Sequence, residues 1–336
     1  MIFSIIDVGT HSAHLLIGQV SRRGSWRTLS ASHDVIRLGD EGLRRGRLTR
    51  AAMARAMTVL RRYAARLAQD HVTQIDAVAT SAVREAANGA AFVRRVRART
   101  KIPLRIISGE EEARLIALGV RRLNHLRGPS LIVSIGGGSA QVSAHDGQRL
   151  RCAWSLPLGA DRLAQRFIRH DPPQPQELAA LRSVLARQWG RAARRLGRAR
   201  QYQALGSSAM IEQLARAASI RPHRGRVFRR DSITQRALCA RIAWLSTSTA
   251  AQRRTLTGVD PDRRALLLPA AVTLLTWMER CGVSTLRVVP GSLRDGLMDT
   301  FCYATFIGNT SVRVIGNRSC GASRRQSKNV IRNLPE

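Results

Sequence analysis

Two short segments of the chain share one pattern, and both are suited to binding phosphate. Asp-Val-Gly-Thr-His-Ser at 7–12 and Ser-Ile-Gly-Gly-Gly-Ser at 134–139 each follow an apolar, β-branched run and lead into alternating sequence. This pattern predicts a strand, a tight turn and a second strand. Turns of glycine and hydroxyl residues let backbone N–H groups converge on an anion, because no Cβ intervenes. Two such turns predict two related domains that face each other across a phosphate-binding cleft.

Strands and helices are expected to alternate along both halves of the chain, which predicts an α/β fold with helices covering the sheets. Strands are expected at 2–7, 13–20, 25–32, 75–79, 104–107, 131–133, 152–156, 202–205 and 285–289. Helices are expected at 49–69, from 81 onward, and at 109–126, 160–168, 177–196 and 265–278.

The pattern breaks at Leu-Arg-Gly-Pro, residues 126–129. A domain boundary is therefore expected there, with an N-terminal domain at 1–126 and a second domain at 127–302. Residues 303–336 are basic and rich in Gly, Asn and Ser, so they are expected to form a loop or a disordered tail.

The chain carries a formal net charge of +34, and nearly all of its cations are arginines. A polyanionic partner is one explanation, and an Arg- and Ala-rich composition set by a GC-rich genome is the other. In either case the charge attracts polyanions, most strongly at low salt. The aromatic content is only 4% and no nucleic-acid motif is present, so a specific nucleic-acid partner is not expected.

The five cysteines are scattered without a Cys-x-x-Cys pair, which argues against a zinc site and a disulfide framework. The most apolar stretch, 265–278, is short for a membrane span and contains Pro269, so a buried helix is expected instead. No signal peptide is evident. These features predict a cytoplasmic protein without a membrane partner.

Several segments, in order and at similar spacing, resemble the exopolyphosphatase/guanosine pentaphosphate phosphatase (Ppx/GppA) family. They are residues 7–12, 80–89, 107–115, 135–139, 156–160, 206–208 and 291–296. The resemblance implies the actin-like ATPase fold, with two ribonuclease-H-like domains around a cleft. It also implies a Mg²⁺-dependent hydrolase that removes terminal phosphate from inorganic polyphosphate or guanosine pentaphosphate (pppGpp), and it allows a homodimer. Both substrates present a terminal phosphoanhydride, so both stay candidates.

Specific roles follow from the same resemblance. It places the catalytic glutamate at Glu111, which would orient and deprotonate a water, and it brings Asp7 toward the metal. The residues implied to bind phosphate are Gly9, Thr10, Ser12, Arg84, Gly136, Gly137, Gly138 and Ser139.

Each of these roles has a simpler alternative. Ser108 and Glu111 fit a capping box, in which Glu111 only closes a helix N-terminus, and Glu110 and Glu112 fit acids that favour a first helical turn. For Arg84 the alternative is that it is one surface arginine among many. For the two turns the alternative is that they are ordinary hairpin turns. Arg294 matches a family motif or is structural, and His11 and His14, beside the first turn, are expected to have no catalytic role.

The second turn departs from the family pattern Asp-Ile-Gly-Gly-Gly-Ser-Thr-Glu. Ser134 stands in place of the Asp and Gln141 in place of the Glu, and those acids are the expected Mg²⁺ anchors. Neutral serine and glutamine are weaker ligands for this hard cation.

Three hypotheses follow from this departure. The chain is a working hydrolase with metal held by Asp7, Glu111 and substrate phosphates. Alternatively, it is a degenerate member that binds polyphosphate or pppGpp as a sensor, or a general nucleic-acid-binding protein driven by its arginines. The sequence favours the first.

Overall fold

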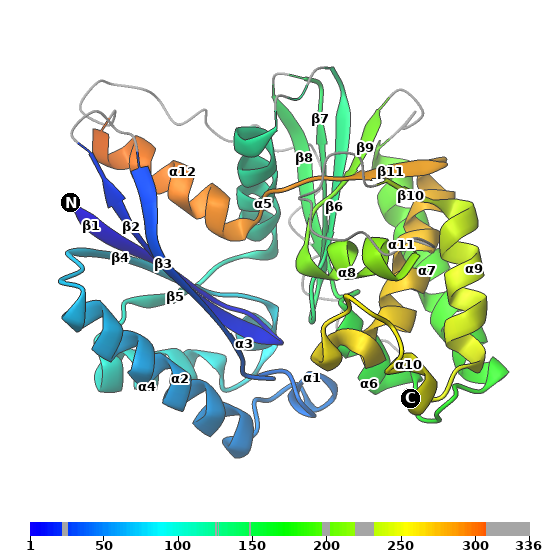
Figure 1. Cartoon of the computed structure of the whole chain (residues 1–336), viewed down its shortest axis with the longest axis horizontal. Coiled ribbons are helices and arrows are strands. Elements are labelled where there is room, and N and C mark those ends of the chain that lie inside the picture. The colour runs from blue at the N-terminus through cyan, green and yellow to red at the C-terminus, as the bar shows by residue number, and fades with distance from the viewer. Residues whose placement is uncertain are drawn as a thin grey trace.

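The structure is a computed structural model that describes residues 1–306 except 22–25, 125, 127, 148, 197–201 and 219–231. Two mixed sheets lie side by side, each with helices packed on it (Figure 1). The α/β class expected from the alternating pattern is confirmed.

The first sheet has the strand order β3-β2-β1-β4-β5. Its strands are β1 (Ile2–Val8), β2 (Ser12–Val20), β3 (Trp26–Val35), β4 (Gln74–Ala79) and β5 (Leu104–Ile106). β1 pairs antiparallel with β2 and parallel with β4. Helices α2 (Arg50–Gln69) and α4 (Gly89–Thr100) bury their apolar stripes against one face of this sheet, as the helical spacing of their apolar residues requires.

The second sheet has the order β10-β11-β9-β6-β7-β8 and repeats the connectivity of the first. Its strands are β6 (Ser130–Ile135), β7 (Ala140–His145), β8 (Leu150–Leu156), β9 (Gln203–Gly206), β10 (Ser232–Thr234) and β11 (Thr285–Val288). β6, β7 and β8 form an antiparallel run, and β9 pairs parallel with β6. In the first sheet, β1, β2 and β3 likewise form an antiparallel run, and β4 pairs parallel with β1. The duplication read from the two turns therefore extends to whole sheets.

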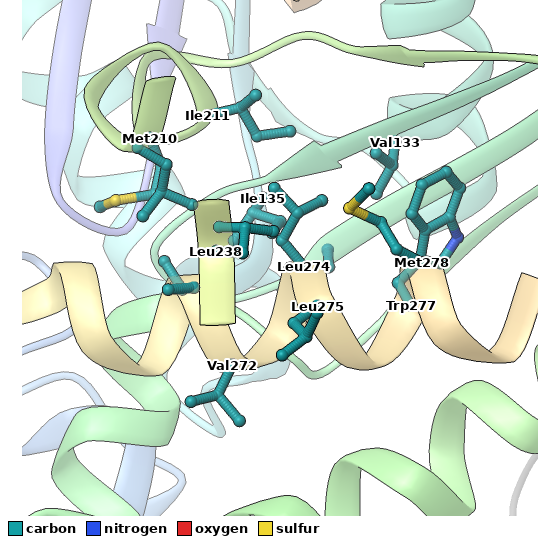
Figure 2. Packing of buried hydrophobic residues seen from close by; sticks show 14 of the residues in the cluster. Val133, Ile135, Met210, Ile211, Leu238, Val272, Leu274, Leu275, Trp277 and Met278 are labelled. Atoms are coloured by element: carbon teal, nitrogen blue, oxygen red, sulfur yellow. The ribbon is translucent and has the colours of Figure 1, made fainter. Parts of the chain in front are cut away.

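The apolar stretch around Pro269 forms α11 (Leu267–Cys281), a helix buried on almost every side. Figure 2 shows Leu274, Trp277 and Met278 of this helix packed with Val133 and Ile135 of β6. The other elements of this half are α6 (Ala160–Phe167), α7 (Pro175–Leu196), α8 (Ala209–Ala218), α9 (Gln235–Thr247), α10 (Ala250–Arg253) and the 3₁₀ helix η2 (Pro261–Leu266). No described helix is both long and apolar enough to cross a membrane.

Two helices, α5 (Gly109–Leu123) and α12 (Leu293–Phe306), lie between the sheets and share one core with both (Figure 1). They approach closely because a glycine stands on each side: a Cβ at Gly119 would lie 2.9 Å from the backbone nitrogen of Gly296. α12 also reaches β1, where Phe301 stacks on Phe3 with ring centroids 4.9 Å apart. The last helix therefore packs partly on the N-terminal sheet, and the boundary at residue 126 stays a prediction.

Two expectations need correction. Residues 303–306 belong to α12 rather than to a loop or tail; residues 307–336 lie outside the described part. The helix expected from residue 81 is split into α3 (Ser81–Glu85) and α4. The Asn88 side chain lies at the break, accepting from the backbone N–H of Leu48 at 2.8 Å and donating to its carbonyl at 2.9 Å. The short helix α1 (Gly42–Arg45) lies close to α3.

Candidate functional site

The two glycine turns have the same internal hydrogen bond. The N–H of Gly9 donates to the carbonyl of Ser12 at 2.9 Å, and the N–H of Gly136 donates to the carbonyl of Ser139 at 2.9 Å. Each turn joins the two strands of an antiparallel pair, β1–β2 and β6–β7. The resemblance between the two sequence segments is therefore a resemblance of backbone geometry.

The fold brings these two turns into contact. A Cβ placed on Gly138 would lie 2.5 Å from both Ser81 Oγ and Thr10 Oγ1, and one on Gly137 would meet Asp161 and Thr10. The hydroxyl residues of the turns, Thr10, Ser12 and Ser139, are buried. All seven turn residues expected to bind phosphate, four in the second turn and three in the first, are thus gathered in one place.

Residues at the start of α6 tie the two halves together beside the turns. Arg162 donates from Nε to the carbonyl of Gly138 at 2.7 Å and from Nη2 to Glu85 Oε2 at 2.6 Å. The preceding residue, Asp161, lies 3.3 Å from Nδ1 of His11 through its Oδ1. We refer to the pairs Arg162–Glu85 and Asp161–His11 as the α6 clasp. Sequence reasoning assigned His11 no catalytic role and did not identify Asp161, Arg162 or Glu85.

Arg84 and Glu112 form a shielded ion pair next to the turns. Arg84 donates from Nη1 to Glu112 Oε2 at 2.8 Å and to the carbonyl of Ile107 at 3.1 Å. The Glu112 side chain is only 9% exposed. Burial raises the pKa of Glu112 to about 7, although Arg84 lowers it, and the negative charges of Asp7 and Glu85 raise it further. Glu112 therefore lies within the field of Asp7 and has a pKa suited to accepting a proton near neutrality.

Glu111, the expected catalytic residue, points elsewhere. Its side chain is 42% exposed and accepts from Arg105 Nη1 at 2.6 Å. Its backbone N–H donates to Ser108 Oγ at 3.0 Å, so Ser108 caps α5, which is one half of the predicted capping box; the Glu111 carboxylate, which would form the other half, pairs with Arg105. The interaction that the structure gives the Glu111 carboxylate is with Arg105 rather than with a turn residue.

A sequence signal for Glu112 was present. The buried stripe of α5 runs through Ala113, Ile116 and Val120, and Glu112 lies on the same face because it precedes Ile116 by four residues. A carboxylate within an apolar stripe is unusual, since buried acids are seldom found without a partner.

Asp7 lies at the end of β1, directly opposite His14 of β2, which is opposite His33 of β3. Asp7 is partly buried, and its buried Oδ1 has no hydrogen-bond partner among the described residues. Burial raises the pKa of Asp7 to about 6, against the opposing charge of Arg294. The negative charge of Asp7 is also among the influences that raise the pKa of Glu112.

Arg294 of α12 reaches this row of side chains. Its Nη1 lies 3.0 Å from His14 Nδ1, and the His14 ring stacks on that of His33 at 4.6 Å. Burial, followed by the charge of Arg294, lowers the pKa of His14 to about 2, so His14 is a neutral acceptor for the guanidinium. His33 Nε2 in turn lies 2.9 Å from Ser12 Oγ. Arg294, left undecided by the sequence, is thus connected to the first turn.

The residues present do not fit a Mg²⁺ site built from protein ligands. Ser134 and Gln141 face each other in the β6–β7 register, and the Gln141 amide donates to Ser139 Oγ at 2.8 Å and Ser155 Oγ at 3.2 Å. Within the described ranges, no three His, Cys, Asp or Glu side chains group so that they could hold a metal. Asp7 offers one free carboxylate oxygen, and the nearby Glu112 is engaged by Arg84.

Comparisons with known proteins agree with this geometry. The Ppx/GppA phosphatase family matches residues 18–302 of the chain. Exopolyphosphatase 1 of Mycobacterium leprae is 30% identical over 319 residues, which cover 93% of this chain and 94% of that protein.

Solved structures match over the same length. The exopolyphosphatase from Cytophaga hutchinsonii has a TM-score of 0.82 and 25% identity, covering 90% of this chain and 98% of that one. The Aquifex aeolicus Ppx/GppA family member has a TM-score of 0.72 and 23% identity, covering 93% and 99%. These matches confirm the expected actin-like ATPase fold.

Proposed function

The chain belongs to the Ppx/GppA phosphatase family, and on that premise we propose that it is an exopolyphosphatase-type hydrolase that releases terminal phosphate from inorganic polyphosphate. The observation that carries the proposal is the buried Glu112–Arg84 pair beside two glycine turns in contact. A base, a cation and groups that position the phosphates are what water attack on a terminal phosphoryl group requires.

In this mechanism the turns at 9–12 and 136–139 hold the phosphates through backbone N–H groups. Arg84 neutralises charge on the terminal phosphoryl group. Glu112 accepts a proton from a water as that water attacks the terminal phosphorus, and the bridging P–O bond breaks to leave a polyphosphate shortened by one phosphate. Family members commonly use a divalent metal. We assign the base to Glu112 rather than to Glu111 because Glu112 is buried and paired with Arg84, a residue expected to bind phosphate, whereas Glu111 is exposed and paired with Arg105.

A second candidate is a degenerate member that binds polyphosphate or pppGpp as a sensor. The observation that favours it is the neutral pair Ser134 and Gln141 beside the second turn. Loss of the two carboxylates of the family pattern leaves the phosphate-binding turns in place, but it weakens the binding of a catalytic metal ion.

The test is phosphate release from long-chain polyphosphate and, in parallel, from pppGpp, by wild type, Glu112→Gln and Glu111→Gln. Release by wild type and Glu111→Gln that disappears in Glu112→Gln supports the proposed hydrolase. Binding of either substrate with no release above the Glu112→Gln level supports the sensor. The substrate from which phosphate is released faster is the preferred substrate.

A further inference from the structure

The wall of the site beside the second turn is polar and uncharged. Gln141 is 3% exposed, and its amide nitrogen donates to Ser139 and Ser155. Ser134, opposite Gln141 in the strand register, is buried as well. The amide turns its hydrogens toward the two hydroxyls and places no negative charge here. A free divalent cation finds no ligand of the kind it prefers in this wall.

Positive charge is instead supplied by guanidinium groups of the chain. Arg84 lies at this wall: a Cβ on Gly109 would lie 2.6 Å from the Ser155 Cβ and 3.8 Å from Arg84 Nη2. Arg294 acts electrostatically on Asp7, which lies in the first sheet. Among the described residues Arg294 has no ion-pair partner, and its hydrogen bond is to the neutral His14. Arg84 thus pairs with Glu112, and the charge of Arg294 acts on Asp7.

From this arrangement we propose that the site beside the two turns binds the terminal phosphates of a polyphosphate chain without a divalent cation, with Arg84 and Arg294 supplying the positive charge and Ser139, Gln141 and Ser155 forming a neutral wall. Guanidinium groups suit this task because their fixed, planar donors match phosphate oxygens. The inference rests on the proposed function for its substrate class, and it concerns binding rather than turnover.

The experiment measures equilibrium binding of imidotriphosphate, a tripolyphosphate analogue in which NH groups replace the bridging oxygens. The analogue therefore resists hydrolysis. Binding is titrated calorimetrically in EDTA and in Mg²⁺ at matched ionic strength. Wild-type affinity in EDTA is expected to stay within about threefold of that in Mg²⁺, less than 1 kcal/mol. A loss of affinity of about tenfold or more in EDTA would overturn the inference.

Binding at this site must be separated from attraction to the basic surface. Arg84→Gln is expected to weaken binding in EDTA by about tenfold. Arg94→Gln removes the same charge from an exposed position on α4, and it is expected to change affinity by less than about twofold. Equal losses in the two variants would mean surface binding and would count against the inference.

A charge-restoring variant gives the converse test. Ser134→Asp/Gln141→Glu adds two carboxylates to the wall, so binding in EDTA should fall by about tenfold and Mg²⁺ should restore it. Metal-free binding as tight as that of wild type would contradict the role given to the neutral wall. If the double variant unfolds, Gln141→Glu alone tests the same point with a smaller charge change.

Failure of this inference and failure of the proposed function have different signatures. Tight metal-free binding without phosphate release refutes the hydrolase and leaves the inference standing. Release and binding that both require Mg²⁺ refute the inference and leave the hydrolase standing.

Discussion

The Arg84 guanidinium donates to the Glu112 carboxylate at 2.8 Å across two helices, α3 and α5, that meet beside the glycine turns. Burial raises the pKa of Glu112 and Arg84 opposes it, leaving a pKa of about 7. An acid poised there is ionised for part of the time near neutral pH and accepts a proton readily. This balance makes Glu112, rather than either neighbouring glutamate, the base that we propose.

Substituting the two adjacent glutamates should therefore have different effects. Glu112→Gln is expected to lower kcat for polyphosphate by about 100-fold or more, since it removes a general base. Glu111→Gln removes only the exposed contact with Arg105 and is expected to leave kcat within about twofold. Steady-state phosphate release measures both. A large loss in Glu111→Gln with activity retained in Glu112→Gln would return the assignment to Glu111.

The pH profile of hydrolysis should report the same carboxyl group. A base with a pKa near 7 must be deprotonated to act, so kcat/KM is expected to rise with pH through about 7 and then level off. Arg84 lowers the pKa of Glu112, so Arg84→Gln should move the rise to higher pH in addition to slowing the reaction. A rise near the ordinary glutamate pKa of 4.5 would exclude Glu112 as the titrating group.

Much of the site could be predicted from the sequence because it lies in short local motifs. The turns at 7–12 and 134–139 carry their geometry in their own glycine and hydroxyl residues, and Arg84 lies in α3, the helix that follows β4 in the chain. The family resemblance placed the catalytic glutamate at Glu111 and left Glu112 as an acid of the first helical turn. The helical stripe of α5, through Ile116 and Val120, distinguishes the two.

Other parts depend on contacts between distant segments. His11 meets Asp161 across 150 positions of sequence and Arg294 meets His14 across 280, and no local pattern links such residues. The return of α12 to the first sheet likewise depends on tertiary packing, through the close approach of Gly119 and Gly296. Sequence periodicity places a helix but does not identify its partner.

The contact between the turns predicts graded effects of added methyl groups. Gly138→Ala would place a Cβ 2.5 Å from Thr10 and Ser81 hydroxyl oxygens, which must move apart. Gly136→Ala would place one 3.3 Å from the Ser139 carbonyl, a milder conflict. We expect Gly138→Ala to weaken imidotriphosphate binding more than Gly136→Ala, by about tenfold, with calorimetry as the measurement. The reverse order would show that the turns do not meet as described.

The α6 clasp should limit separation of the two halves of the molecule. Arg162→Gln removes the ion pair with Glu85 and the bond from Nε to the Gly138 carbonyl, so the segments 9–12 and 136–139 should exchange backbone hydrogens faster. Hydrogen–deuterium exchange with mass spectrometry measures this. Arg166→Gln removes the same charge one turn later from an exposed position and is the control. Unchanged exchange in Arg162→Gln would mean that the clasp does not hold the turns together.

His14 should make the stability of the fold sensitive to acid. Its pKa is about 2 in the folded protein against an ordinary 6.5, so below pH 6.5 the unfolded chain binds a proton that the folded chain excludes. The contribution of neutral His14 to the free energy of unfolding is therefore fully present above pH 6.5 and is lost progressively as the pH falls toward 2. His14→Gln keeps an acceptor for Arg294 but does not titrate, so its Tm should fall less steeply between about pH 6.5 and 4.5. Thermal unfolding over that range measures this, with His71→Asn at an exposed position as the control. Parallel slopes for wild type and His14→Gln would show that His14 is protonated in the folded state.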